Sequence, residues 1–173
     1  MQTRRCIERV AVLLLITVNA VAFGKEEAAP QELTSGITIF SPDRFWKISV
    51  SEKEGQFLLV FEHENFQKVV DQSPKPIFYL YWSERSKYLV ILRPVGFCTM
   101  AKVLALKPEQ NLIVDLFASE RSNQRPWIDY SFKSWNLKEG FVSLNVHENL
   151  SYVEEPRDPR LLAIEYIYLD GKT

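Results

Sequence analysis

Two histidines stand in almost the same sequence context, and that context could bind a metal ion. His63 and His147 are each followed by Glu and Asn. Imidazole and carboxylate groups are ligands of Zn²⁺, so the two segments would form a site if the fold brought them together. Zinc sites more often come from clustered His and Cys, and the chain has no such cluster. We therefore expect both histidines at exposed strand ends, and we predict no metal and no cofactor.

A second group of candidate catalytic residues is the set of carboxylates in the stretch YVEEPRDPR. Glu154, Glu155 and Asp158 could perform general acid–base chemistry on a sugar, which needs a pair of carboxyl groups. Arg157 and Arg160 balance their charge, and two prolines stiffen the stretch. These features are more typical of a solvated loop, which could still bind a ligand.

The usual signatures of catalysis are otherwise missing from the sequence. There is no Gly-x-Ser-x-Gly elbow and no glycine-rich phosphate loop, and the chain has only 6 glycines. Cys98 lies among apolar neighbours with no histidine near it in the sequence, which favours a small buried side chain over a reactive thiol. We therefore predict no catalytic residue, and a protein that is not an enzyme.

A segment rich in arginine and aromatic residues is the best candidate for binding a partner. Arg121, Arg125, Trp127 and Tyr130 surround a polar run, and these residue types dominate binding hot spots. The same rings could stack on sugars. The alternative is that Trp127 and Tyr130 face the core while the arginines only aid solubility.

The N-terminus is typical of a secretory signal peptide. Arg4, Arg5 and Arg9 form a basic region, residues 10–18 are almost wholly apolar, and Ala20-Val21-Ala22 offers small residues for cleavage. The apolar run is shorter than the about 20 residues that a membrane span needs. We expect residues 1–22 to be removed and the protein to be periplasmic or secreted.

The remaining chain reads as one domain behind a short lead-in. Residues 23–35 are polar and predicted to be disordered, and residues 36–173 are predicted to form a single β domain. The whole chain has a formal charge of −1, and the leader holds three arginines and one glutamate, so the remainder carries −3. This charge gives no global attraction to nucleic acid, and we expect no membrane span in the mature chain.

Short runs of branched and aromatic residues alternate with turn residues along this domain, which predicts an antiparallel meander of about ten strands. The expected strands are 36–40, 45–50, 56–61, 76–82, 88–94, 101–107, 112–117, 127–135, 141–146 and 161–171. Residues 64–73 could form either a short helix or a strand.

Two internal similarities indicate a repeated hairpin, but they disagree about its register. One aromatic residue precedes another by six positions at Phe40 and Trp46, at Trp82 and Tyr88, and at Trp135 and Phe141. A second similarity relates residues 53–66 to residues 138–150, through Lys-Glu-Gly, an apolar strand and His-Glu-Asn. The sequence does not choose between them.

The turns of these hairpins resemble those of WD-type β-propeller repeats in exported bacterial proteins. The residues that carry the likeness are Ser41-Pro42-Asp43, Trp82-Ser83 with Lys87-Tyr88-Leu89, and WNLKEGFVSL at 135–144. The resemblance implies about three blade-like sheets, fewer than the about four to eight of a closed propeller. Such a chain has open edges, which it must pair with another subunit, close differently, or cover with loops. A β-sandwich is the other architecture that the pattern allows.

Together these features predict an exported β protein that acts by binding a partner protein or a second copy of itself. The alternative is a small carbohydrate-binding module, which should expose two or three aromatic rings on one flat face.

Overall fold

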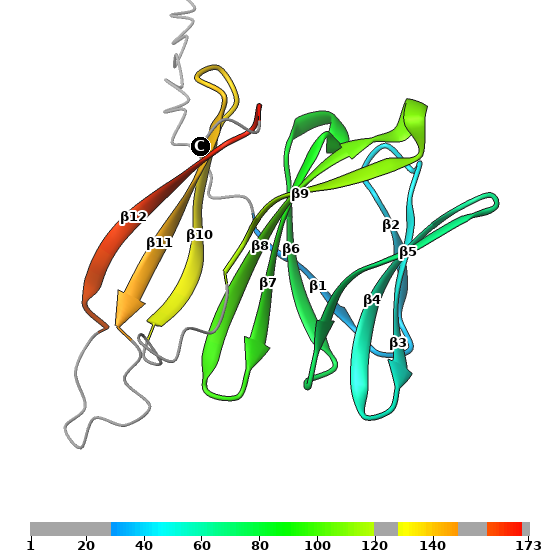
Figure 1. Ribbon diagram of the computed structural model, residues 1–173, viewed down its shortest axis with the longest axis horizontal. Helices are drawn as coiled ribbons and strands as arrows, with labels where there is room; N and C mark the ends of the chain where they lie inside the picture. The colour runs from blue at the N-terminus through cyan, green and yellow to red at the C-terminus, as the bar shows by residue number, and fades with distance from the viewer. Residues whose placement is uncertain (1–28, 120–127, 149–158, 171–173) are drawn as a thin grey trace, which may run out of the picture.

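The fold is a row of three open antiparallel sheets. The computed structural model describes residues 29–119, 128–148 and 159–170. Within these residues the chain forms twelve strands and two short 3₁₀ turns, and no α-helix (Figure 1). The prediction of an all-β antiparallel meander is therefore confirmed.

Each sheet is built from strands that follow one another in the chain, apart from β1. The first sheet has the order β2 (Thr38–Phe40), β3 (Lys47–Lys53), β4 (Gln56–His63) and β5 (Phe66–Ser73). The second has the order β1 (Gln31–Thr34), β6 (Ile77–Trp82), β7 (Tyr88–Val95), β8 (Cys98–Lys107) and β9 (Leu112–Ala118). The third has the order β10 (Ile128–Asn136), β11 (Phe141–Glu148) and β12 (Leu161–Tyr168). The 3₁₀ turns are η1 (Glu84–Ser86) and η2 (Pro108–Gln110).

Two local expectations are settled by these elements. The disordered lead-in predicted for 23–35 is wrong at its C-terminal end, because residues 31–34 form β1 and pair with β6. Leu33 is fully buried there, so packing against the second sheet orders a segment whose own composition is polar. The ambiguous segment 64–73 is a strand, β5. None of the helical turns in the described part of the chain is long and apolar enough to cross a membrane.

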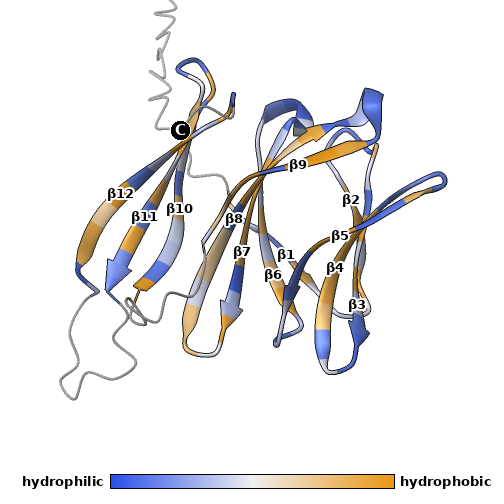
Figure 2. Cartoon of the chain, viewed as in Figure 1, coloured by the Kyte–Doolittle hydropathy of each residue, from blue (hydrophilic) through white to orange (hydrophobic). Residues whose placement is uncertain are grey.

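Two hydrophobic clusters hold the three sheets together. The first lies between the first and second sheets and includes Trp46, Phe61 and Leu104, each fully buried. The second lies between the second and third sheets and includes Val90 and Leu144. The strands of the second sheet therefore carry apolar residues on both faces. Hydrophilic residues collect in the turns at the strand ends (Figure 2). This pattern is expected for a sheet packed on both sides.

The first hairpins of the first and second sheets share one turn structure. Ser41 and Ser83 each accept a hydrogen bond at Oγ from the backbone N–H of the residue five positions on, Trp46 and Tyr88, at 2.9 Å in both turns. Each serine N–H also donates to the carbonyl of that aromatic residue. Both serines are buried, so these side chains replace water for backbone groups inside the turn.

The first hairpin of the third sheet has the same length, with Asn136 in place of the serine. Its carbonyl accepts from the N–H of Glu139, three residues on, as Ser83 accepts from Ser86. The turns after β2, β6 and β10 therefore correspond, which supports the six-residue aromatic spacing. The competing similarity matches the β3–β4 turn with the β10–β11 turn, which join strands in a different order within their sheets. It is not the structural repeat.

Ser83→Ala is expected to lower the free energy of unfolding by about 1–3 kcal/mol, because the partly buried N–H of Tyr88 loses its side-chain acceptor. Urea denaturation of the variant measures this loss. Ser51→Ala is the matched control, since Ser51 is exposed in β3 and should change stability by less than about 0.5 kcal/mol. Equal losses in the two variants would contradict the role given to the turn.

The repeat also defines corresponding positions on the faces of the sheets. On the face towards the next sheet in the chain, Ile48 and Val50 of β3 correspond to Val90 and Leu92 of β7, and all four are buried in the clusters. On the opposite face, Leu89 and Ile91 of β7 correspond to Val142 and Leu144 of β11, which are buried too. The internal faces are therefore apolar at each of these equivalent positions.

The two outermost faces of the row carry polar residues at these same positions. Lys47 and Ser49 of β3 replace the buried aliphatic pair on the outer face of the first sheet, and Ser143 and Asn145 of β11 do so on the third. Lys47 Nζ lies 2.8 Å from Glu62 Oε2, and this hydrogen bond is the main cause that lowers the pKa of the Glu62 carboxyl. The outer faces are therefore less apolar than the internal faces at these positions, although Ser143 is itself buried.

Candidate functional site

A groove opens where the turns of the second and third sheets meet the end of β12. It consists of two adjoining hollows of about 450 and 600 Å³ that share Lys87, Tyr88 and Leu169. The first hollow is lined by η1, the β10–β11 turn and residues 168–170. The second is lined by the end of β8 and by η2. Four segments that are far apart in the sequence thus form one surface.

Backbone hydrogen bonds fix these segments relative to one another. The N–H of Leu106 donates to the carbonyl of Lys87, and the N–H of Leu169 donates to the carbonyl of Gly140, each at 2.8 Å. Arg85 and Ser86 both have positive φ, at 57° and 52°. Ser86 is fully buried and accepts from the N–H of Asp43 at 3.1 Å, which links η1 to the first sheet. The groove wall is therefore held in a conformation that non-glycine residues seldom adopt.

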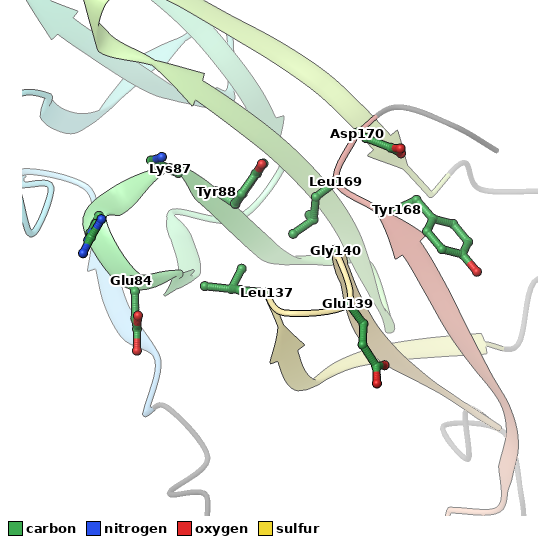
Figure 3. Close-up of a pocket in the computed structure, with 10 residues that line it drawn as sticks. Glu84, Lys87, Tyr88, Leu137, Glu139, Gly140, Tyr168, Leu169 and Asp170 are labelled. Carbon is green, nitrogen blue, oxygen red and sulfur yellow. The ribbon is translucent and has the colours of Figure 1, made fainter.

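The middle of the groove is apolar and its rim is charged. Figure 3 shows Leu137, Tyr88 and Leu169 around the centre. The carboxylates of Glu84 and Glu139 point outward (Figure 3). Leu137 is 39% exposed although it is a leucine in a turn. This arrangement suits an apolar side chain of a partner at the centre, with polar contacts around it.

An aromatic surface adjoins the groove on the outer face of the third sheet. Phe141, Tyr166 and Tyr168 lie on neighbouring strands, since Phe141 pairs with Tyr168 and Ser143 pairs with Tyr166. The ring centroids of Phe141 and Tyr166 are 5.2 Å apart, in an edge-to-face arrangement. Tyr166 and Tyr168 are 53% and 51% exposed. We call these three residues the aromatic face; Tyr168 also lines the groove, so the two surfaces are continuous.

The contact residues predicted from the sequence are placed only in part. Arg121, Arg125 and Trp127 lie outside the described residues. Tyr130 lies in β10 and is 7% exposed, with its ring in the second cluster and its hydroxyl 3.3 Å from Glu165 Oε1. Tyr130 therefore offers little area to a partner, as the alternative interpretation of that segment expected.

The candidate chemical residues do not converge as a metal site. His63 stacks on Phe45 in the first sheet, whereas His147 belongs to the third. No group of three or more His, Cys, Asp or Glu that could hold a metal ion occurs in the described ranges. Glu154, Glu155 and Asp158 lie outside those ranges.

The fold does bring together a serine and a histidine that the sequence did not suggest. Ser131 Oγ of β10 lies 3.1 Å from His147 Nε2 of β11. Such a contact is the first requirement of a nucleophile and its base. A triad also needs a group that orients the imidazole, and His147 Nδ1 has no hydrogen-bond partner among the described residues. The pair alone therefore defines no active site.

Other residues singled out in the sequence are structural. Cys98 is buried at the start of β8, as expected. Trp82 packs against the first cluster and donates from Nε1 to Gln31 Oε1 at 3.0 Å. Trp135 packs against the second cluster. Neither tryptophan is the exposed ring of a binding surface.

Sequence reasoning missed the groove because its residues come from four separate segments. Two signals were nevertheless present. Leu137 interrupts an otherwise polar turn, and the last strand carries Tyr166 and Tyr168 in alternation, which places both rings on one face.

Comparison with known proteins gives little further information. No protein family model and no curated protein matches the chain. Among solved structures, a periplasmic gluconolactonase of Pseudomonas aeruginosa is similar at a TM-score of 0.34 and 12% identity, over 83% of this chain and 44% of that one. The chain thus spans less than half of that neighbour's length. The coarse expectation of blade-like β sheets is met, but WD-type repeats are not confirmed.

This neighbour also corrects one prediction. We predicted from the sequence that the protein is not an enzyme, and that prediction is contradicted because the similar structure is named as an enzyme. A likeness at this level assigns no activity to the present chain. We therefore withdraw the exclusion of catalysis and build the functional proposal on the geometry of the groove.

Proposed function

We propose that this protein is exported and acts by binding a partner protein through the groove and the adjoining aromatic face. The leader-like residues 1–22 support export, with the β domain as the exported part. The observation that carries the proposal is the exposed apolar set of Leu137 in the groove and Tyr166 and Tyr168 on the aromatic face, two surfaces that meet at Tyr168. Large apolar residues exposed together usually mark an interaction site.

The geometry fits a protein partner better than a small ligand. The two hollows are open to the surface, and their charged residues surround an apolar centre instead of converging on one point. A hot spot has this organisation, with a buried anchor and a polar rim. Arg121, Arg125 and Trp127 remain proposed as a second contact segment.

The test is capture of partners from an envelope extract with the immobilised full chain and its variants. Leu137→Asp is expected to reduce the captured partner at least about 30-fold, because a hot-spot change of about 2 kcal/mol corresponds to that factor. Val69→Asp is the matched control, since Val69 is 50% exposed on β5 in the first sheet. Equal capture by both variants, with both folded by circular dichroism, would contradict the proposal.

A carbohydrate ligand is the second candidate, and one observation favours it. Phe141, Tyr166 and Tyr168 place three rings on the outer face of the third sheet, next to Asn145 as a hydrogen-bonding group. Sugars stack on such rings. Titration with envelope glycans, followed by tyrosine fluorescence, distinguishes this function: saturable binding lost in Tyr166→Ala would favour the sugar.

A further inference from the structure

Strand β12 is an edge strand that lacks the usual protection against pairing. In the described part of the chain it pairs only with β11. Leu161, Leu162, Tyr166 and Tyr168 of this strand are each about half exposed, at 48%, 51%, 53% and 51%. No other strand in the described ranges has so many of the exposed large apolar residues. Edge strands normally carry a proline or an outward charge that prevents association.

The one charged residue of β12 does not provide this protection. Glu165 is opposite Leu144, whose side chain is buried between the second and third sheets, so Glu165 points inward. Its carboxylate accepts a hydrogen bond from the hydroxyl of Tyr130. The only irregularity in the β11–β12 ladder is a bulge at Leu162, because Val146 pairs with Ala163 and His147 with Leu161. Among the described residues, 163–168 therefore form a regular edge whose outward-facing side chains, Ile164, Tyr166 and Tyr168, carry no charge.

We propose that this edge pairs antiparallel with the same edge of a second copy of the chain. The sequence of the strand disfavours two of the possible registers. In a two-fold symmetric antiparallel pair, the axis passes between a residue and its own copy. An axis at Glu165 would place two carboxylates opposite each other, which is unfavourable. An axis at Ile164 would bring the bulge at Leu162 into the paired stretch.

An axis at Tyr166 avoids both problems. Tyr166 then faces its own copy, Ile164 faces Tyr168, and Glu165 faces Ile167 of the other chain. Side chains of facing residues lie on the same side of a sheet, so the aromatic and aliphatic residues form one stripe across the junction. The result is a continuous six-stranded sheet made from two three-stranded sheets.

Face-to-face association is a weaker alternative for the same molecule. The outer faces of the first and third sheets carry Lys47, Ser49 and Asn145 where internal faces are aliphatic. Stacking these faces into a closed ring would bury polar groups without designed partners. Edge pairing leaves both faces in water and satisfies the open backbone groups of β12.

The dimer deepens the proposed function. Only its use as a wider binding surface rests on that function. The two-fold axis is perpendicular to the joined sheet, so both aromatic faces lie on the same side. A partner would meet a surface twice as wide, with one groove at each end. The dimer itself does not depend on which partner binds.

Sedimentation equilibrium of the full exported chain is the first test. We expect a dimer, which Tyr166→Lys converts to a monomer because two ammonium groups would face each other at the axis. Val69→Lys, a change at a similarly exposed residue of the first sheet, should remain dimeric. Circular dichroism checks that both variants are folded. If the unaltered protein remains monomeric at 100-fold the concentration used in the partner-capture assay, the proposal is overturned.

Oxidative cross-linking tests the register in a Cys98→Ala background. Tyr166→Cys should give covalent dimers, whereas Glu165→Cys should give none. Ile164→Cys should cross-link only when mixed with Tyr168→Cys. Dimers trapped by Glu165→Cys but not by Tyr166→Cys would overturn the proposed pairing. A monomeric protein that still loses its partner on Leu137→Asp would overturn the dimer and leave the proposed function intact.

Discussion

Replacing Trp46 with alanine is expected to lower the free energy of unfolding by about 3–5 kcal/mol. Among the described residues Trp46 is the largest fully buried side chain, and it belongs to the cluster between the first and second sheets. Its ring lies 5.4 Å from that of Phe66 and 6.1 Å from that of Phe61, measured between centroids. Alanine would remove these contacts and leave a cavity that the sheets, fixed by their own ladders, fill only in part. Urea denaturation followed by circular dichroism measures the loss.

Two further variants test the explanation of this loss: the first replaces the ring with a smaller aromatic ring, and the second removes an exposed ring. Trp46→Phe should cost much less, because the ring nitrogen of Trp46 is buried and has no hydrogen-bond partner among the described residues. Phe40→Ala removes an aromatic ring that is 55% exposed on β2 and should change stability by less than about 0.5 kcal/mol. A similar loss for Phe40→Ala and Trp46→Ala would show that the first cluster is not the core of the domain.

Arg93→Met is expected to destabilise the protein by about 3–5 kcal/mol, because it leaves a buried carboxylate without its counter-charge. Arg93 of β7 pairs with Asp71 of β5, and this ion pair connects the first two sheets. The side chain of Asp71 is only 4% exposed. Burial also lowers the pKa of the Arg93 guanidinium, which reflects the cost of removing that charge from water.

The double variant Asp71→Leu, Arg93→Met provides the informative comparison. Asp71 Oδ2 and Arg93 Nε are both buried without hydrogen-bond partners in the described residues, so the pair is incompletely satisfied. We expect the double variant to regain most of the stability that the single variant loses. The exposed pair of Lys47 and Glu62 is the matched control, and Lys47→Met should cost at most about 1 kcal/mol. A double variant no more stable than Arg93→Met would contradict this explanation.

The sequence predicted those parts of the fold that depend on local pattern. Alternating apolar residues with turn residues between them placed most strands, and the spacing of Trp82 and Tyr88 identified a hairpin that recurs. The sequence did not predict β1, because residues 31–34 are polar and become a strand only by pairing with β6. Propensity for β structure depends on such neighbours.

The candidate site was less predictable for a different reason. The sequence indicated Arg121 to Tyr130, which is one continuous segment rich in hot-spot residues. The groove instead combines Tyr88, Leu137 and Leu169, whose proximity follows from the packing of the second sheet on the third. The contact of Ser131 with His147 likewise depends on strand register, which composition does not specify.

The polar residues on the outer face of the first sheet end the row on that side. Many β assemblies stop growing by closing into a ring, but here one end is set by side chains at a few positions of β3. Lys47 and Ser49 occupy the positions that are aliphatic on the internal faces, whereas the outer face of the third sheet combines Asn145 with the exposed rings of Tyr166 and Tyr168. A duplicated copy of the second sheet, inserted between its neighbours, would find apolar faces on both sides. The same copy fused beyond the first sheet would not, because it would meet Lys47 and Ser49.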